Sequence, residues 1–89
     1  MLSVVICTHN PPLEFLTRVL KRMEIQSLSR DQWELLLVDN ASTKAVAGQV
    51  DLSWHPQGRH VQEEKLGLTN ARIKGFTESR GDWVVLVDD

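Results

Sequence analysis

Three short apolar runs constrain the fold of this chain more than any other feature of its sequence. They are Ser3–Thr8 (SVVICT), Trp33–Val38 (WELLLV) and Asp82–Val87 (DWVVLV). The first run is rich in β-branched residues and lacks the alternation of polar and apolar residues that a strand with one wet face shows. This pattern is typical of a strand that is covered on both faces, as in a parallel sheet. We therefore expect the first run to be a covered strand and the other two runs to be further strands.

The segments between the runs indicate helices and one poorly patterned stretch. After Pro12, apolar residues recur at helical spacing from Leu13 to about Ser27. A second helical pattern covers Gly67–Ser79 and is weakened by Gly75. The remaining expectations are a brief helix over Lys44–Val50, a loop over Asp51–His60 and a minimal strand near Val61. Strands that alternate with helices predict an α/β fold, with an open, mostly parallel, Rossmann-like sheet and flanking helices.

Size, charge and cysteine content limit the classes of protein to which the chain can belong. With 89 residues, 42% of them hydrophobic and 25% charged, it is expected to fold as a single domain. Ten Lys and Arg residues against twelve Asp and Glu residues leave a net charge of −2, so nothing points to nucleic acid as a partner. One cysteine, Cys7, excludes an internal disulfide, and no apolar run approaches the length of a membrane span. We expect a cytoplasmic chain.

Polar residues follow each of the three runs. These residues are Thr8, His9 and Asn10, then Asp39 and Asn40, and finally Asp88 and Asp89. Ligands of open α/β sheets bind beyond the carboxyl ends of the strands, where these residues would meet. Carboxylates that converge there would suit a hard divalent cation or a polyhydroxylated ligand. The alternative is that each carboxylate only caps a turn and faces water.

Several common motifs are absent, and this narrows the chemistry. The chain has no G-x-G-x-x-G fingerprint, no P-loop and no G-x-S-x-G elbow. Cys7 lies inside a predicted strand, where a thiol is usually inert core. The three histidines, His9, His55 and His60, lack helical metal-ligand spacing and are expected to be ordinary loop residues. Trp54 and Trp83 are expected to pack against the core or surface.

Four segments of the chain, in order, resemble motifs of the family 2 glycosyltransferases of the GT-A fold. Ser3–Asn10 resembles the family's opening strand and turn, and Glu34–Thr43 resembles its second strand with the V-D-(D/N)-x-S turn. Gly67–Gly75 is similar to its G-x-x-x-A-R-N-x-G helix, and Gly81–Asp89 to the strand that leads into its D-x-D motif. Lys44 and Ile73 depart from the family pattern. Since the sequence stops within the D-x-D motif, residues 1–89 are expected to be one truncated domain.

The resemblance implies the nucleotide half of an enzyme that transfers sugar from a nucleoside-diphosphate sugar, with a UDP-sugar favoured. Thr8, through its backbone, and Asn10 would border base and ribose, and Asp39 would accept a hydrogen bond from a uracil-like base. Arg72 would lie near base or diphosphate, and Lys65 is a weaker candidate for the same place. Asp88 and Asp89 would hold Mg²⁺ or Mn²⁺, with Asp88 alternatively on the ribose. The family's catalytic base and acceptor site lie later in the chain, so these residues alone are expected to be inactive.

Two other classes of function remain open from the sequence. One is a nucleotidyltransferase-like enzyme, which is disfavoured because a glycine- and lysine-rich phosphate loop is missing after the first strand. The other is a non-enzymatic module of flavodoxin or receiver type, whose acidic edge would bind a regulatory cation. For any of these, exposed faces of the chain could support a homodimer.

Overall fold

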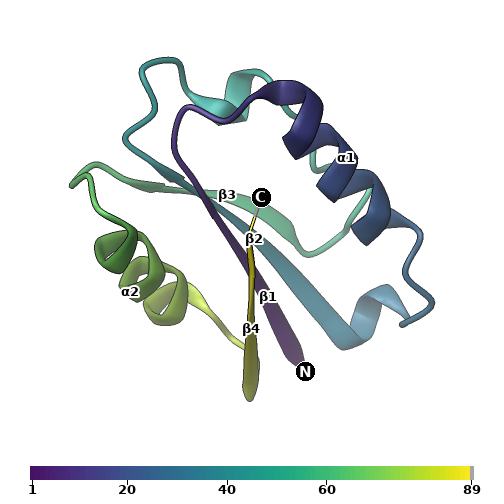
Figure 1. Ribbon diagram of the computed structural model, residues 1–89. Helices are drawn as coiled ribbons and strands as arrows, with labels where there is room; N and C mark the ends of the chain where they lie inside the picture. The colour runs from purple at the N-terminus through teal and green to yellow at the C-terminus, as the bar shows by residue number, and fades with distance from the viewer. Residues whose placement is uncertain (89) are drawn as a thin grey trace.

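The computed structural model describes residues 1–88, with only the backbone at Asp88, and shows a parallel sheet between two helices (Figure 1). The elements are β1 (Leu2–Thr8), α1 (Leu13–Glu24), the 3-10 helix η1 (Arg30–Gln32), β2 (Trp33–Asn40), the 3-10 helix η2 (Val46–Gly48), β3 (Gly58–Glu63), α2 (Leu68–Glu78) and β4 (Trp83–Asp88). The strand order is β3-β2-β1-β4, and every neighbouring pair is parallel. The predicted α/β fold with an open parallel sheet is confirmed.

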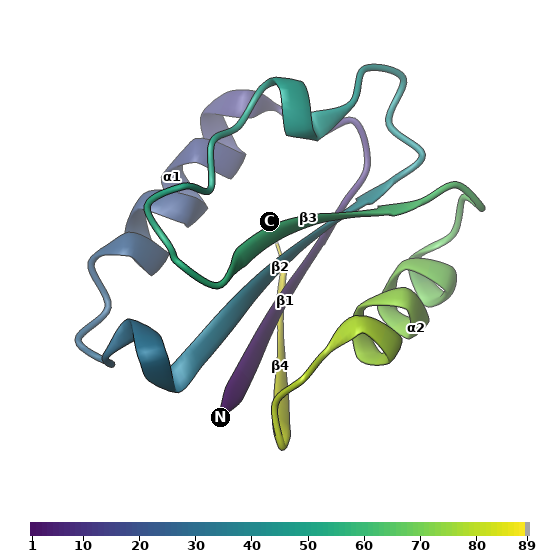
Figure 2. The same cartoon turned by 180° about the vertical axis from the view of Figure 1, so that it is seen from behind.

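One helix covers each face of the sheet, because alternate residues of the central strands point in opposite directions (Figures 1 and 2). On one face Val4 and Ile6 of β1 pack with Leu16 and Leu20 of α1. On the other face the buried residues are Val5, Leu36, Val38, Val61 and Ala71, the last of them from α2. Every residue of β2 is buried. Burial on both faces explains why the apolar runs of β1 and β2 show no alternation of polar and apolar residues.

Gly75 allows close packing between α2 and β1, although in the sequence it only weakens the helical pattern. A Cβ atom built at this position would lie 2.5 Å from Cγ1 of Val5. The glycine therefore allows α2 to lie directly against β1. The cost of a glycine inside a helix is offset by this close approach.

The stretch before α2 contains a longer strand than the sequence predicted. β3 begins at Gly58 and runs in register with β2 from Leu35 to Asn40. The expected strand near Val61 is therefore confirmed but is longer than predicted, and the expected loop ends before Gly58 rather than at His60. Only Val61 of this edge strand is buried, so its sequence carries no apolar pattern. Pairing with β2 holds it extended, and the same pairing extends β2 through Asn40 rather than ending it at Val38.

Three other local expectations also need correction. α1 ends at Glu24 rather than about Ser27, and the brief helix after β2 is only the single turn η2. His60 lies in β3 rather than in a loop. His55 is 2% exposed and packs edge-on against Trp33, with ring centroids 4.2 Å apart. Burial lowers the pKa of His55, and the charge of Arg30 lowers it further.

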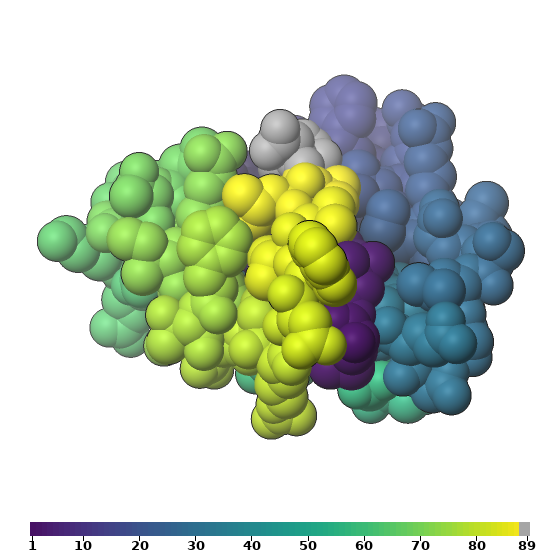
Figure 3. All heavy atoms as spheres, turned by 90° about the horizontal axis from the view of Figure 1, so that it is seen from below, coloured from purple at the N-terminus to yellow at the C-terminus, as the bar shows by residue number. Residues whose placement is uncertain are grey.

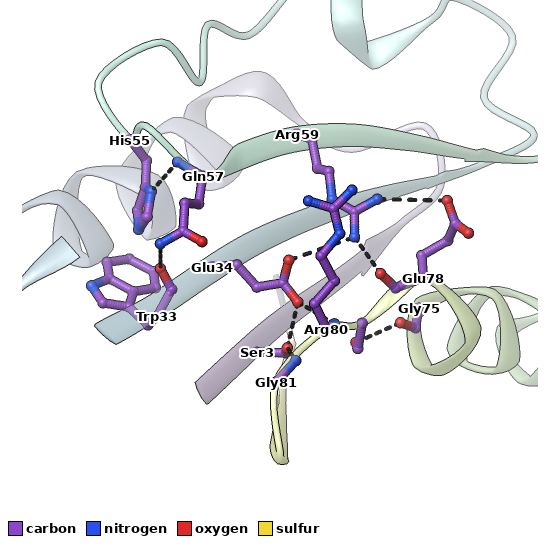
Figure 4. A network of polar contacts seen from close by, with 11 residues as sticks. Ser3, Trp33, Glu34, His55, Gln57, Arg59, Gly75, Glu78, Arg80 and Gly81 are labelled. Carbon is purple, nitrogen blue, oxygen red and sulfur yellow. Dashed lines mark hydrogen bonds and ion pairs between the residues drawn. The ribbon is translucent and has the colours of Figure 1, made fainter. Parts of the chain in front are cut away.

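A buried polar network centred on Glu34 joins the amino ends of the strands (Figure 4). Its carboxylate is 2% exposed and accepts hydrogen bonds from the Ser3 hydroxyl at 2.5 Å and the Arg80 backbone N–H at 2.6 Å. Nη2 of Arg59 lies 3.5 Å from its other oxygen. Burial raises the pKa of Glu34, but the bonds from Ser3 and Arg80 and the Arg59 charge outweigh burial and hold it below its ordinary value. The network ties β1, β2, β3 and the connection between α2 and β4 together.

The outer edge of β4 pairs with no other strand within residues 1–88. Four consecutive apolar side chains of β4 are exposed, at 75% for Trp83, 37% for Val84, 44% for Val85 and 41% for Leu86. Trp83 therefore packs much less than expected, whereas Trp54 packs beside Trp33 and beneath Arg30. Figure 3 shows β4 (yellow) uncovered between α2 (green) and β1 (purple). Neither helix of the described chain has the length and apolar character that crossing a membrane requires.

Candidate functional site

The carboxyl ends of all four strands meet at one edge of the sheet, because the strands are parallel. Thr8 at the end of β1 pairs with Asp39 of β2, and Cys7 pairs with the backbone of Asp88 in β4. The chain turns sharply beyond these ends. Positive φ angles occur at Asn10 (44°) and Ala41 (54°), in the turns that follow β1 and β2. The edge therefore brings together residues that lie far apart in the sequence.

Asn10 links the two turns. Its backbone N–H donates to the Ser42 hydroxyl at 2.8 Å, and its side-chain oxygen accepts from the Thr43 N–H at 2.8 Å. His9 adds a third link, since its Nδ1 donates to the Asn40 carbonyl at 2.7 Å. These bonds hold the turn after β1 against the turn after β2, which accounts for the left-handed backbone at Asn10.

Asp39 lies beneath the turn after β2 and is 1% exposed. Oδ1 accepts from the Ser42 N–H at 3.2 Å, and Oδ2 accepts from the Val46 N–H at 2.9 Å and from Gln62 Nε2 at 3.3 Å. Burial raises the pKa of Asp39, but the hydrogen bonds from Ser42, Val46 and Gln62 outweigh burial and hold it below its ordinary value. The carboxylate is thus ionised and supports the turn, while its contact with a base stays a prediction.

Asn40 faces the opposite connection, between β3 and α2. Its Nδ2 donates to the carbonyls of Glu63 at 3.1 Å and Lys65 at 2.9 Å. Its Oδ1 accepts from the N–H of Gly67 at 2.9 Å. Gly67 has a φ of +145°, which favours glycine, and its carbonyl accepts the Ala71 N–H at the start of α2.

A cavity of about 260 Å³ lies between the end of β1 and the start of α2. It is lined by Cys7, Thr8, His9, Asn40, Leu66, Gly67, Leu68 and Ala71. Cys7 lies in β1 and packs against the core on the α2 face, as expected, but it is partly rather than fully buried and also lines this cavity. Pockets for drug-sized ligands begin at about 300 Å³, so this cavity matches a smaller ring such as a nucleobase. Larger hollows lie beside η2 and along the outer side of α1.

The two predicted basic residues lie beside this cavity but are not among its lining residues. Arg72 is partly exposed on α2, directly after the lining residue Ala71. Lys65 is exposed, and its backbone N–H donates to the Glu63 carboxylate at 3.0 Å. Their contact with an anionic ligand stays a prediction.

The predicted metal ligands fall at the limit of the described chain. Only the backbone of Asp88 is placed, at the end of β4 beside Cys7, and Asp89 lies outside the described residues. Among the residues that the structure describes, no group of three or more His, Cys, Asp and Glu side chains is arranged to hold a metal ion.

Sequence reasoning missed part of the cavity. It noted His9 and Asn40 only as polar residues at strand ends, and it gave no role to Leu66 or Gly67. The signal available was the Gly67 position at the start of the predicted helix. The closure of the connection after β3 onto Asn40 depends on the full length of β3, of which the sequence predicted only a minimal strand near Val61.

Comparison with protein families identifies the family of this chain. The family model described as "Glycosyl transferase family 2" matches residues 3–89. The chain belongs to glycosyl transferase family 2. This membership decides against the nucleotidyltransferase-like and receiver-like alternatives. It also makes this a glycosyltransferase-family chain whose fold corresponds to the N-terminal part of the GT-A fold.

Solved structures agree with the family 2 assignment at the level of the fold. The crystal structure of S. aureus TarS 1-349 matches with a TM-score of 0.83 and 23% sequence identity, over 98% of this chain and 26% of that one. TarS 1-349 in complex with UDP matches with the same scores and coverage. The complex with UDP-GlcNAc matches with a TM-score of 0.79 and 21% identity, again over 98% and 26%. A comparison with curated proteins found no match. The family 2 chain described here spans about a quarter of TarS 1-349.

Proposed function

We propose that this chain is the nucleotide-binding part of a glycosyltransferase that uses a nucleoside-diphosphate sugar, with a UDP-sugar favoured. The observation that carries the proposal is the cavity at the carboxyl edge of the sheet, bounded by Thr8 and the start of α2, in a chain of family 2. Ligands of open α/β sheets bind at this edge. The structures of TarS with UDP and with UDP-GlcNAc have the same fold, which supports the choice of nucleotide.

In this proposal the base enters the cavity from the side of Asn10 and Asp39, which are not themselves among the lining residues. The backbone of Thr8 and the side chain of Asn10 border base and ribose. Asp39 accepts a hydrogen bond from the N–H of uracil, and a carboxylate rejects bases that lack a donor there. Arg72 pairs with the diphosphate through its planar donors.

Asp88 and Asp89 are the proposed ligands of Mg²⁺ or Mn²⁺, with Asp88 also within the sugar nucleotide site. Carboxylate oxygens are the ligands that such hard cations prefer. The position of the Asp88 backbone, at the same edge as Thr8, supports this assignment. A bound cation supplies positive charge to the diphosphate leaving group.

An NMR titration tests nucleotide binding. We expect UDP with Mg²⁺ to shift the backbone amides of Thr8, Asn10, Asp39 and Gly67, and Mn²⁺ in place of Mg²⁺ to broaden the resonances of Asp88 and Asp89. CDP is the control, because the cytosine ring has an acceptor where uracil has its N–H, and its shifts should be smaller at equal concentration. An unchanged spectrum at millimolar UDP would refute the proposal.

Sugar transfer is proposed for a longer protein that contains this domain. We propose that residues 1–89 form one nucleotide-sugar-binding unit, which binds the donor but does not transfer its sugar without the family's acceptor site and catalytic base. The acceptor is not specified by any residue of the described chain. The cytoplasm is the compartment that we propose, since the single thiol suits a reducing environment.

We also propose that two copies of this chain pair through β4. In an antiparallel pair centred on Val85, Trp83 of one copy lies opposite Val87 of the other, and Val84 lies opposite Leu86. This register sets the exposed apolar residues of β4 in one copy against the same residues of the other copy. A two-fold symmetric dimer requires a surface that is complementary to itself in this way.

Sedimentation velocity tests this pairing. We expect Val85→Lys to convert the dimer to a monomer, because it places like charges at the centre of the strand pair. Ile73→Lys is the matched control, since Ile73 is an exposed apolar residue of α2 and should leave the dimer intact. A wild-type chain that stays monomeric up to millimolar concentration contradicts the proposal.

A further inference from the structure

We infer that Asn40 is a positioning residue that holds both walls of the cavity in place, and that this position requires an amide. The inference rests on the proposed function, because it concerns the cavity in which the base is proposed to bind. It adds a residue whose side chain the proposed contacts with nucleotide do not use.

The side chain of Asn40 fixes one wall. Its three hydrogen bonds go to successive parts of the connection between β3 and α2, at Glu63, Lys65 and Gly67. Leu66, Gly67 and the start of α2 line the cavity, so the bonds set where this wall lies. With 4% of its surface exposed, Asn40 makes these bonds away from water, where each broken bond is costly.

The backbone of Asn40 fixes the other wall. Its carbonyl accepts the hydrogen bond from Nδ1 of His9, which follows β1 and lines the cavity beside Thr8. Nε2 of His9 in turn lies 3.1 Å from the side-chain nitrogen of Asn10. One residue at the end of β2 therefore connects the turn after β1 with the entrance to α2.

The partners of Asn40 explain why an amide is needed. Two of them are carbonyl oxygens, which require a donor, and the third is an N–H, which requires an acceptor. The neighbouring Asp39 meets the opposite environment, because the protein groups that bond to its oxygens are donors, N–H groups among them. A carboxylate at position 40 would face two carbonyls and be repelled. The adjacent acid and amide are thus matched to different partners.

The first experiment needs no ligand. In the wild-type chain we expect the side-chain NH₂ protons of Asn40 and the N–H of Gly67 to exchange slowly with solvent. In Asn40→Asp the exchange of the Gly67 N–H should be at least about tenfold faster. Gln26→Glu makes the same chemical change at an exposed site just beyond the C-terminal end of α1 and should leave the exchange of the Gly67 N–H unchanged. Rapid exchange of the Asn40 NH₂ protons in wild type overturns the inference.

The second experiment measures UDP affinity against pH. We expect Asn40→Asp to raise the dissociation constant for UDP at least about tenfold relative to wild type at neutral pH. The ratio of the two constants should fall as the pH falls toward 5, because the introduced carboxyl group gains a proton that it can donate to a carbonyl. A ratio near one at neutral pH, or a ratio that does not change with pH, overturns the inference. If wild type fails to bind UDP, the proposed function is wrong, and the exchange experiment still decides the role of Asn40.

Discussion

Replacing Glu34 with alanine is expected to lower the free energy of unfolding by about 3–5 kcal/mol, a large share of the about 5–15 kcal/mol that stabilises an ordinary domain. The substitution leaves the Ser3 hydroxyl and the Arg80 N–H without their ionised acceptor, and it removes one of the two carboxylates beside Arg59. A donor that loses an ionised acceptor away from water costs more than its bond contributed, because water cannot readily replace the lost partner. The network also joins β1, β2, β3 and the connection between α2 and β4, so its loss weakens the whole amino edge of the sheet.

Urea unfolding followed by the fluorescence of the buried Trp33 measures this effect. Glu78→Ala is the matched control, because Glu78 also lies beside Arg59, at 3.6 Å, but its side chain is 39% exposed. Its loss should cost less than about 1 kcal/mol. Equal costs for the two substitutions would show that burial of Glu34 is not the reason for its contribution.

Lowering the pH should also remove the contribution of Glu34 to the free energy of unfolding. Since the pKa of Glu34 is lower in the folded chain than in the unfolded chain, the unfolded state takes up a proton first as the pH falls. The contribution of Glu34 is therefore complete above its unfolded pKa and is lost as the pH falls through the lower folded pKa. We expect Glu34→Gln to be less stable at neutral pH and to lose less stability than wild type below about pH 4.5.

Asp39→Ala is the second substitution with a large expected effect, on both stability and nucleotide binding. It removes the acceptor of the Ser42 and Val46 N–H groups at a position that is 1% exposed. Leaving buried N–H groups unpaired should cost about 2–4 kcal/mol in urea unfolding. Because Ser42 also anchors Asn10, the turn after β1 should shift and UDP binding should be lost.

Two further substitutions separate support of the turn from contact with the base. Asp51→Ala removes an exposed carboxylate that accepts the Ser53 N–H, and it should change neither stability nor binding appreciably. Asp39→Asn keeps the shape of the side chain and one acceptor. If Asp39 contacts the base, Asp39→Asn should reduce the preference for UDP over CDP. Expressed as a free energy, this reduction should exceed the loss in the free energy of unfolding. An unchanged preference would restrict Asp39 to the support of the turn.

Parts of the fold were predictable because burial leaves a mark on composition. β1 and β2 are apolar runs, since central strands of a parallel sheet are covered on both faces and need side chains that suit a dry environment. β4 is also an apolar run, although its side chains from Trp83 to Leu86 are exposed in the described chain. The length of β3 was not predictable beyond a minimal strand near Val61, because an edge strand with one buried residue has no apolar pattern to detect. Its extended form comes from pairing with β2.

The candidate site likewise has a part that the sequence predicts and a part that it does not. Residues at strand ends follow from the parallel arrangement, so Thr8, Asn10 and Asp39 could be placed at one edge from sequence and family resemblance. Their contacts could not. Burial of Asp39 under donors and the hydrogen bonds of Asn40 depend on turns whose partners lie about 25 residues or more away in several cases.

The sequence by itself determined the α/β class, the chemical types of residue at the sheet edge and the family resemblance, since periodicity and motif spacing are local properties. The tertiary structure alone decided the strand order, the cavity and the different roles of Asp39 and Asn40. The physical reason is that a hydrogen-bonding group takes its role from the donors and acceptors that surround it. At this edge, those donors and acceptors come from other strands and turns.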